Sequence, residues 1–258
     1  MTEEQLRRVT IGEPIRHDAP ITLCEYDPTW PELFSREERR IRKALGDRVI
    51  QLEHVGSTSV PGLAAKPIID VLLVVADCAD ESTYVPALEA EGYVLRIREP
   101  DWYQHRLLKG PDTNLNLHVF STAAAEIDRM LSFRDLLRTN PETWELYDQT
   151  KRELARRTWK YVQNYADAKS EIIEQILRST TPTPPESRSG GVPRPRALHG
   201  GRLRARGDPN ACAFICRDPS ADRATSDGTD HGGRGQSLAC GDQARETVTA
   251  RDFRPATR

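Results

Sequence analysis

The sequence predicts an α+β domain, built on one mixed β-sheet with flanking helices and a helical segment at its C-terminal end. Segments with strand character come first along the chain, with short helices between them, and longer helical segments follow. Apolar residues alternate with period two in several of the early segments, which is typical of half-buried strands. The composition then changes sharply after residue 180, which sets the limit of the predicted domain.

The C-terminal stretch, residues 181–258, differs in composition from the rest of the chain. It holds 8 of the 18 prolines, 10 of the 16 glycines and 13 arginines, but no lysine. Its apolar residues are too sparse and too irregular to offset the conformational entropy that folding removes. We therefore expect a flexible arm over residues 1–19, a folded domain over 20–180 and a disordered Gly/Pro/Arg-rich tail over 181–258.

Charge and hydropathy narrow the class of protein. Setting aside the tail's 13 arginines and 9 acidic residues leaves 24 basic and 30 acidic residues in residues 1–180, a formal charge of −6. Nucleic-acid-binding proteins usually carry a net basic face, so we expect no nucleic acid as a partner. The chain has no run of 18 apolar residues, and its first residues have no signal-peptide core. These features predict a cytoplasmic protein that does not bind a membrane.

The first half of the domain predicts a helix between strands. Residues 21–26 (ITLCEY) alternate in the manner of a strand. The helix over residues 27–46 carries a capping-box pattern, Thr29-x-x-Glu32, at its start and Gly46 at its end. After it we expect a strand at 49–55, a loop at 56–67 and a strand at 68–75.

The second half predicts further strands and then helices. A short helix is expected at 82–91, followed by strands at 93–98, 104–109 and 114–120. Alternation divides the last strand into an apolar face of Leu115, Leu117 and Val119 and a polar face of Asn114, Asn116 and His118. From residue 124 to about 178 the pattern is helical, with an interruption near Pro141, because the residue before a proline leaves the α region.

A Gly-Ser turn follows the strand at 49–55, in the stretch EHVGSTSVPG. Gly56 lets backbone amides approach an anion closely, and the hydroxyls of Ser57 and Thr58 add hydrogen-bond donors. Such turns often cradle phosphate, especially before a helix. Gly-Ser turns are also common in loops that bind nothing, so the turn alone does not decide the function.

A lone carboxylate lies inside the hydrophobic run of the next strand, IIDVLLVV. On a strand, Asp70 shares a face with Ile68, Leu72 and Val74, opposite Ile69, Val71, Leu73 and Val75. Burial of an unpaired charge is unfavourable, so Asp70 either pairs with Lys66 or Arg106, or serves a ligand. Beside a phosphate-binding turn, a carboxylate supplies the oxygen ligand that Mg²⁺ or Mn²⁺ uses in phosphoryl and nucleotidyl transfer.

Several blocks of the sequence together resemble the GrpB family over about residues 20–178. They are HVGSTSVPGLAAKPIIDVLLVV, HRLLKG, NLHVF, FRDLLR, YDQTKRELA and YADAKSEII. Members of that family look like the nucleotidyltransferase superfamily, so the resemblance implies a nucleotidyltransferase-like sheet and a nucleoside triphosphate as ligand. A similar domain is fused behind dephospho-coenzyme A kinase in some bacteria, which implies a kinase as a possible partner.

The resemblance also implies roles for individual residues. Superfamily members usually present Asp-x-Asp or Asp-x-Glu on the acidic strand and a third carboxylate on a neighbouring strand. Here Leu72 stands two positions after Asp70, and the neighbouring strand offers His118. Asp70 and Glu53 are therefore the candidate ligands of Mg²⁺ or Mn²⁺, and His118 is the candidate general base.

The candidate nucleotide-binding residues lie in the Gly-Ser turn and in basic positions of the matching blocks. They are Gly56, Ser57, Thr58, Lys66, Arg106, Lys109, Arg134, Lys151 and Lys169. An isolated lysine or arginine more often lies on a solvated face than in a binding site. These basic residues are functional candidates only if the fold brings them to the Gly-Ser turn.

Two functions follow as alternatives. The first is an enzyme that binds a nucleoside triphosphate with a divalent metal and transfers a nucleotidyl group to an unknown acceptor, a small molecule or a protein. The second is a non-catalytic module that binds a nucleotide or a coenzyme A precursor and assists a partner such as dephospho-coenzyme A kinase. The feature that separates them is whether a second acidic oxygen, from Glu53 or elsewhere, lies near Asp70.

Overall fold

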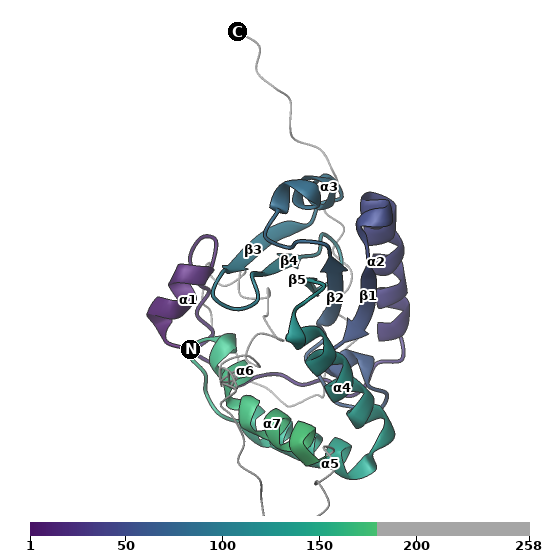
Figure 1. Ribbon diagram of the computed structural model, residues 1–258. Helices are drawn as coiled ribbons and strands as arrows, with labels where there is room; N and C mark the ends of the chain where they lie inside the picture. The colour runs from purple at the N-terminus through teal and green to yellow at the C-terminus, as the bar shows by residue number, and fades with distance from the viewer. Residues whose placement is uncertain (180–258) are drawn as a thin grey trace, which may run out of the picture. The chain divides into compact units, whose positions relative to one another are not determined.

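A five-stranded mixed β-sheet forms the centre of the computed structural model, which describes residues 1–179 of the chain (Figure 1). The strand order is β1-β2-β5-β4-β3. The central pair β2 and β5 runs parallel, and the other neighbouring pairs run antiparallel. The predicted α+β class with one mixed sheet and flanking helices is confirmed.

The strands and helices alternate early in the chain and helices alone follow later. The strands are β1 (Gln51–Val55), β2 (Ile69–Val75), β3 (Val94–Glu99), β4 (His105–Lys109) and β5 (Leu115–Ser121). The α-helices are α1 (Glu3–Val9), α2 (Trp30–Leu45), α3 (Val85–Ala90), α4 (Ala125–Thr139), α5 (Pro141–Ala155), α6 (Val162–Ala168) and α7 (Ser170–Ser179). Short 3₁₀ turns are η1 (Gly46–Arg48), η2 (Ser57–Ser59) and η3 (Glu81–Thr83).

Two cores cover the two faces of the sheet. On one face, helices α2 and α3 pack over the β2 row of Ile69, Val71, Leu73 and Val75 and the β5 row of Leu115, Leu117 and Val119. On the other face, α4 packs over Leu72, Val74 and Phe120. This division confirms the faces that alternation predicts for both strands. Asp70, Asn116 and His118 belong to the second face, and all three are buried.

The C-terminal helices build a separate apolar cluster at one end of the sheet. Helix α4 packs against α5 and α7, and the cluster includes Val60 and Leu63 from the loop before β2. Figure 1 shows α5, α6 and α7 gathered there. The loop that carries the Gly-Ser turn is therefore held between the sheet and these helices.

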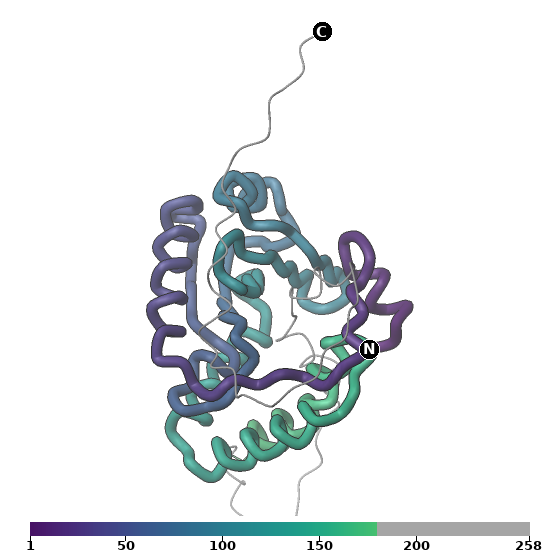
Figure 2. Tube along the Cα trace, turned by 180° about the vertical axis from the view of Figure 1, so that it is seen from behind, coloured from purple at the N-terminus to yellow at the C-terminus, as the bar shows by residue number. Residues whose placement is uncertain are grey.

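The segment between α1 and α2 does not form the predicted strand. Cys24 makes one isolated bridge with Ala65, and the Ile21 amide donates to the Ala155 carbonyl. Figure 2 shows this segment running past the C-terminal helices on its way to α2. The prediction of a strand at 21–26 is wrong. This segment lies along the loop before β2 and the end of α5, where it has no strand of the sheet to pair with.

The helix starts and breaks also differ in part from the sequence patterns. Residues 3–9, inside the predicted arm, form α1. A capping box between Thr2 and Gln5 caps the N-terminus of this helix. The Thr29 side chain makes no capping bond to α2 and donates to Asp27 instead, at 2.7 Å. The break at Pro141 is confirmed, with Asn140 capping α5, but the chain also leaves the helix between α5 and α6.

Within residues 1–179, no helix is long and apolar enough to cross a membrane. The predicted tail over 181–258 lies outside the described residues.

Candidate functional site

The Gly-Ser turn packs directly against the side chain of Asp70. Val55 is the register partner of Asp70 in the β1–β2 pair, so the turn that follows β1 arrives beside it. Gly56 has a φ of +69°, and a Cβ at this position would lie 2.4 Å from Asp70 Oδ2. Glycine is required here both for the left-handed backbone and for this close approach.

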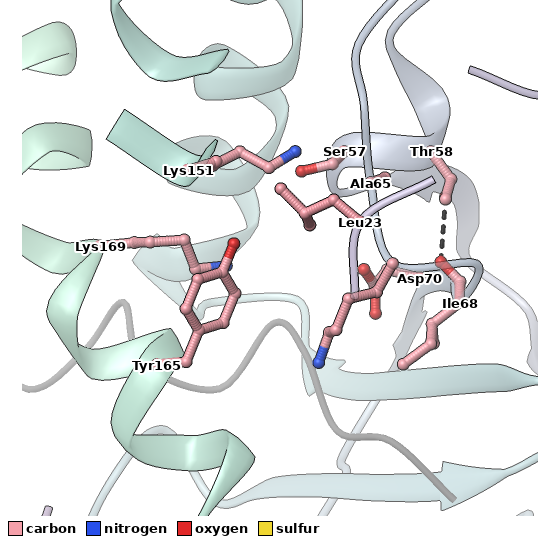
Figure 3. Close-up of a pocket in the computed structure, with 10 residues that line it drawn as sticks. Leu23, Ser57, Thr58, Ala65, Ile68, Asp70, Lys151, Tyr165 and Lys169 are labelled. Carbon is pink, nitrogen blue, oxygen red and sulfur yellow. Dashed lines mark hydrogen bonds between the residues drawn. The ribbon is translucent and has the colours of Figure 1, made fainter. Parts of the chain in front are cut away.

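A small buried cavity lies between the turn and the C-terminal helices (Figure 3). Ser57 and Asp70 line it from one side, and Lys66, Lys151 and Lys169 line it as well. Its volume is about 10 Å³, roughly the space that one water molecule needs. The structure thus brings together three of the predicted lysines, the turn and the predicted carboxylate.

The three lysines come from three different parts of the chain. Lys66 precedes β2, Lys151 lies in α5 and Lys169 stands between α6 and α7. Figure 3 shows Lys151 pointing from its helix toward Ser57. All three are nearly fully buried, and the side chains that line the cavity carry three positive formal charges and one negative one. The lining of the cavity therefore has a net positive formal charge, the sign that pairs with an anionic group.

Aromatic rings and a carbonyl contact the ammonium groups. Lys151 Nζ donates to the Ala64 carbonyl and lies 5.2 Å from the centre of the Tyr147 ring. Lys169 Nζ lies 4.8 Å and Lys66 Nζ 6.0 Å from the centre of the Tyr165 ring. Contacts between a cation and an aromatic face stabilise a buried ammonium.

Asp70 is held by polar side chains of the neighbouring strands. Asn116, its register partner on β5, donates from Nδ2 to Asp70 Oδ1 at 2.7 Å. Lys109 on β4 donates to Asn116 Oδ1 at 2.5 Å. The predicted residue Lys109 therefore contacts Asp70 through Asn116 and does not line the cavity.

A row of buried histidines ends at Asp70. His118 Nε2 lies 3.6 Å from Asp70 Oδ1, and His118 Nδ1 lies 3.2 Å from His105 Nε2. His105 Nδ1 in turn lies 2.8 Å from Glu99 Oε2. In the tautomer with a proton on Nδ1 of each ring, His105 donates to Glu99 and His118 donates to His105. His118 Nε2 then carries a lone pair, and in that tautomer His118 can accept a proton.

The turn hydroxyls have different surroundings. Thr58 Oγ1 donates to the Ile68 carbonyl, and His54 Nε2 lies 3.1 Å from the same oxygen. Burial lowers the pKa of His54 to about 4, and the nearby Asp70 charge opposes that shift. His54 is therefore neutral at pH 7 and donates to Thr58. Because the Thr58 hydroxyl is used inside the turn, Ser57 is the better candidate for contact with a ligand.

The donor atoms near Asp70 do not match the expected metal site. Glu53 pairs in register with Leu72, whereas the register partner of Asp70 is Val55. Glu53 Oε2 accepts from Arg134 at 2.9 Å. Mg²⁺ prefers an octahedron of oxygen ligands, whereas Asp70 has an amide and an imidazole beside it. Within residues 1–179, no three acidic, histidine or cysteine side chains are grouped closely enough to hold a metal.

Two of the predicted basic residues lie away from the cavity. Arg106 pairs in register with Val119, which faces α2 and α3, and its Nε donates to Glu81 at 2.6 Å. Arg134 contacts Glu53 and the His54 carbonyl from α4. Neither residue meets the lysines, and Arg106 is not the partner of Asp70.

Sequence reasoning did not single out Glu99, His105 or Asn116. Asn116 had a usable signal, because it shares the polar face of β5 with His118 and aligns with Asp70. His105 and Glu99 meet only because the β3–β4 connection folds back at Tyr103, whose φ is +52°. No spacing rule in the sequence indicates that contact.

Comparison with known proteins identifies relatives of this chain. The family described as GrpB protein matches residues 20–179. UPF0157 protein BH1888 of Halalkalibacterium halodurans is 61% identical over 182 residues, which is 70% of this chain and 93% of that protein. The crystal structure of conserved protein GrpB from Enterococcus faecalis has a TM-score of 0.55 at 34% identity, and the match covers 61% of this chain and 96% of that one.

Two further likenesses are partial. Dephospho-CoA kinase of Mycolicibacterium paratuberculosis is 40% identical over 78 residues, which is 29% of this chain and 19% of that protein. The structure of Cid1 in complex with the UTP analogue UMPNPP covers 52% of this chain and 41% of that one, with a TM-score of 0.30 at 13% identity.

Proposed function

The chain belongs to the GrpB family, and on that premise we propose that it binds a phosphate-bearing ligand, a nucleotide or a coenzyme A precursor, beside the Gly-Ser turn. The observation that carries this proposal is the convergence of Lys66, Lys151 and Lys169 on one cavity with Ser57. Ammonium groups and a hydroxyl are the donors that a phosphate accepts from in proteins.

The cavity is too small to admit a phosphate group without a movement of side chains. Its volume of about 10 Å³ is smaller than a phosphate group needs. The long, flexible stems of Lys151 and Lys169 let their ammonium groups move outward and close again around an anion. We expect binding to require this rearrangement of side chains.

The arrangement of carboxylates favours binding over transfer. Superfamily-type transfer needs a second acidic oxygen near Asp70, and the nearest candidate from sequence, Glu53, is engaged by Arg134. The ligand-binding module is therefore the main proposal. The partial likeness to dephospho-CoA kinase supports a kinase of that class as the partner that the module assists.

The histidine row supports nucleotidyl transfer as a second candidate. In that reaction an acceptor hydroxyl oxygen bonds to the α-phosphorus, the bond to the β-phosphate oxygen breaks, and pyrophosphate leaves. His118 Nε2, in contact with His105 and through it with Glu99, would take the hydroxyl proton after side chains move to admit the acceptor, because His118 is buried. The acceptor is an unidentified small molecule or protein. Mg²⁺ or Mn²⁺ on Asp70 stays a prediction tied to this candidate.

Calorimetry separates the two candidates. The protein is titrated with pyrophosphate, the four nucleoside triphosphates and dephospho-coenzyme A, with magnesium and with EDTA. A binding module takes a phosphate ligand in EDTA and leaves it intact. Release of pyrophosphate from a triphosphate, in the presence of magnesium and an acceptor, would favour the enzyme. Absence of binding by every phosphate compound would overturn both.

A further inference from the structure

A second, larger hollow lies on the other side of the Gly-Ser turn, between α2, the end of β1 and the junction of α4 and α5. It encloses about 740 Å³, within the usual range of small-molecule sites, about 300–1,000 Å³. His54 and Ser59 line this groove, whereas Ser57 and Thr58 line the lysine cavity. The two sites therefore share one turn but have different walls.

Half-buried aromatic side chains form much of the wall of the groove. Tyr26, Phe34 and Trp144 line it from three separate segments of the chain. Phe34 stacks on His54 with ring centres 4.8 Å apart and planes at 7°, so its position is fixed. Rings that are held in place and keep part of their surface open are the features that bind a planar apolar body.

One cationic group in the groove keeps a nitrogen available for an anion. Arg138 donates from Nε and Nη2 to the Ser59 carbonyl, at 3.1 and 2.8 Å. Its Nη1 lies 3.8 Å from Asp135 Oδ1, which is beyond hydrogen-bond distance. The side chain is 36% exposed, and Nη1 is the guanidinium nitrogen that makes no hydrogen bond within the described residues.

The other charged groups of the groove are already matched. Arg134 is only 12% exposed and contacts both Glu53 and Asp135. His54 is neutral at pH 7, because burial lowers its pKa to about 4. Burial and the neighbouring Arg134 charge also lower the pKa of Arg138. A bound anion would offset both effects at Arg138.

We propose that this groove binds a second small molecule, a planar aromatic compound with one anionic group, whose ring packs on Tyr26, Phe34 and Trp144 and whose anion accepts from Arg138 Nη1. The proposal does not depend on phosphate binding at the lysines. It assigns a ligand to a part of the surface that neither candidate function uses.

The test uses 1-naphthoate as the probe, because it carries an anionic carboxylate and no phosphate, and calorimetry on the full chain. Wild-type protein should bind the probe more tightly than it binds 1-naphthol or acetate. Arg138→Gln should weaken binding by about 10-fold or more, the usual effect of losing a charged hydrogen bond. Arg42→Gln, an exposed arginine of α2 that pairs with Glu38, is the matched control and should change nothing.

Two further variants locate the probe. Ser35→Phe fills the groove from α2 without removing a charge, so it should abolish binding even if Arg138→Gln disturbs the turn. Lys151→Met changes the other cavity and should leave the affinity for the probe within about twofold, because Lys151 does not line the groove and shares no contact with the probe. Binding that is lost in Lys151→Met but kept in Arg138→Gln and Ser35→Phe would overturn the proposal, as would no binding by wild type.

Discussion

The imidazole of His118 faces the carboxylate of Asp70 across two parallel strands, with Nε2 3.6 Å from Oδ1. Both side chains are almost fully buried. Asp70 also accepts from Asn116, and His118 is oriented by His105. The carboxylate inside a hydrophobic strand is therefore one end of a polar network, which removes the need for a metal to explain its burial.

Replacing Asp70 by Asn should lower the stability of the fold. The change removes the charge that Asn116 donates to and places an amide beside Gly56. Loss of a hydrogen bond to a buried charge lowers the free energy of unfolding by about 1.5–3 kcal/mol. Urea denaturation at pH 7 in EDTA measures this effect. Wild-type stability in the variant, with only metal-dependent binding lost, would restore Asp70 as a metal ligand.

Replacing Gly56 by Ala should destabilise the protein more than the same change at Gly46. Both glycines have positive φ, but an added Cβ meets Asp70 Oδ2 at 2.4 Å in the first case and nothing within 4 Å in the second. We expect about 1 kcal/mol for Gly46→Ala from backbone strain alone and about 3 kcal/mol or more for Gly56→Ala, which adds displacement of a buried carboxylate. Equal losses in urea denaturation would show that the contact with Asp70 is unimportant.

His54 should make the protein less stable at acidic pH. Its pKa is about 4 in the folded state, against 6.5 for a free histidine. The unfolded state therefore binds the proton first, and stability falls as pH drops from 6.5 to 4, by about 3 kcal/mol at most.

Glu126 acts in the opposite direction, because burial raises its pKa to about 7. Stability tied to Glu126 is lost as pH rises from 4.5 through 7.

The variant His54→Gln isolates the histidine contribution from that of Glu126. It keeps a donor for Thr58 but cannot take up a proton. Between pH 7 and 4 the variant should lose less stability than wild type, when both are followed by urea denaturation. Parallel stability curves for the two proteins would mean that His54 titrates normally in the folded state.

The alternation of apolar residues was enough to predict both faces of β2 and β5. Each of these strands is central and buried, so its alternating apolar residues indicate which side chains share one face of the sheet. The same pattern failed at 21–26, because alternation does not tell a strand from an extended segment that bridges a loop. The break between α5 and α6 has no glycine or proline signal, and Ala19 bridges Trp159 there.

The candidate site was predictable to the extent that it is local. Gly56, Ser57, Lys66 and Asp70 lie within 15 residues of one another, and the β1–β2 hairpin brings them together. Lys151 and Lys169 reach the same cavity only through the packing of α5 and α6. Glu53 shows the opposite outcome, because its ion pair with Arg134 joins residues 81 positions apart, which no local pattern reveals.

Binding of pyrophosphate in EDTA tests the central claim most directly. Calorimetry compares wild type with Lys151→Met and Lys169→Met, and with Lys43→Met, an exposed lysine of α2, as the matched control. We expect metal-independent binding by wild type and by the control. Each cavity variant should bind about 10-fold more weakly or worse, because a charged hydrogen bond is lost. Equal affinity in all four proteins, or binding only with added magnesium, would contradict the lysine cavity as the phosphate site.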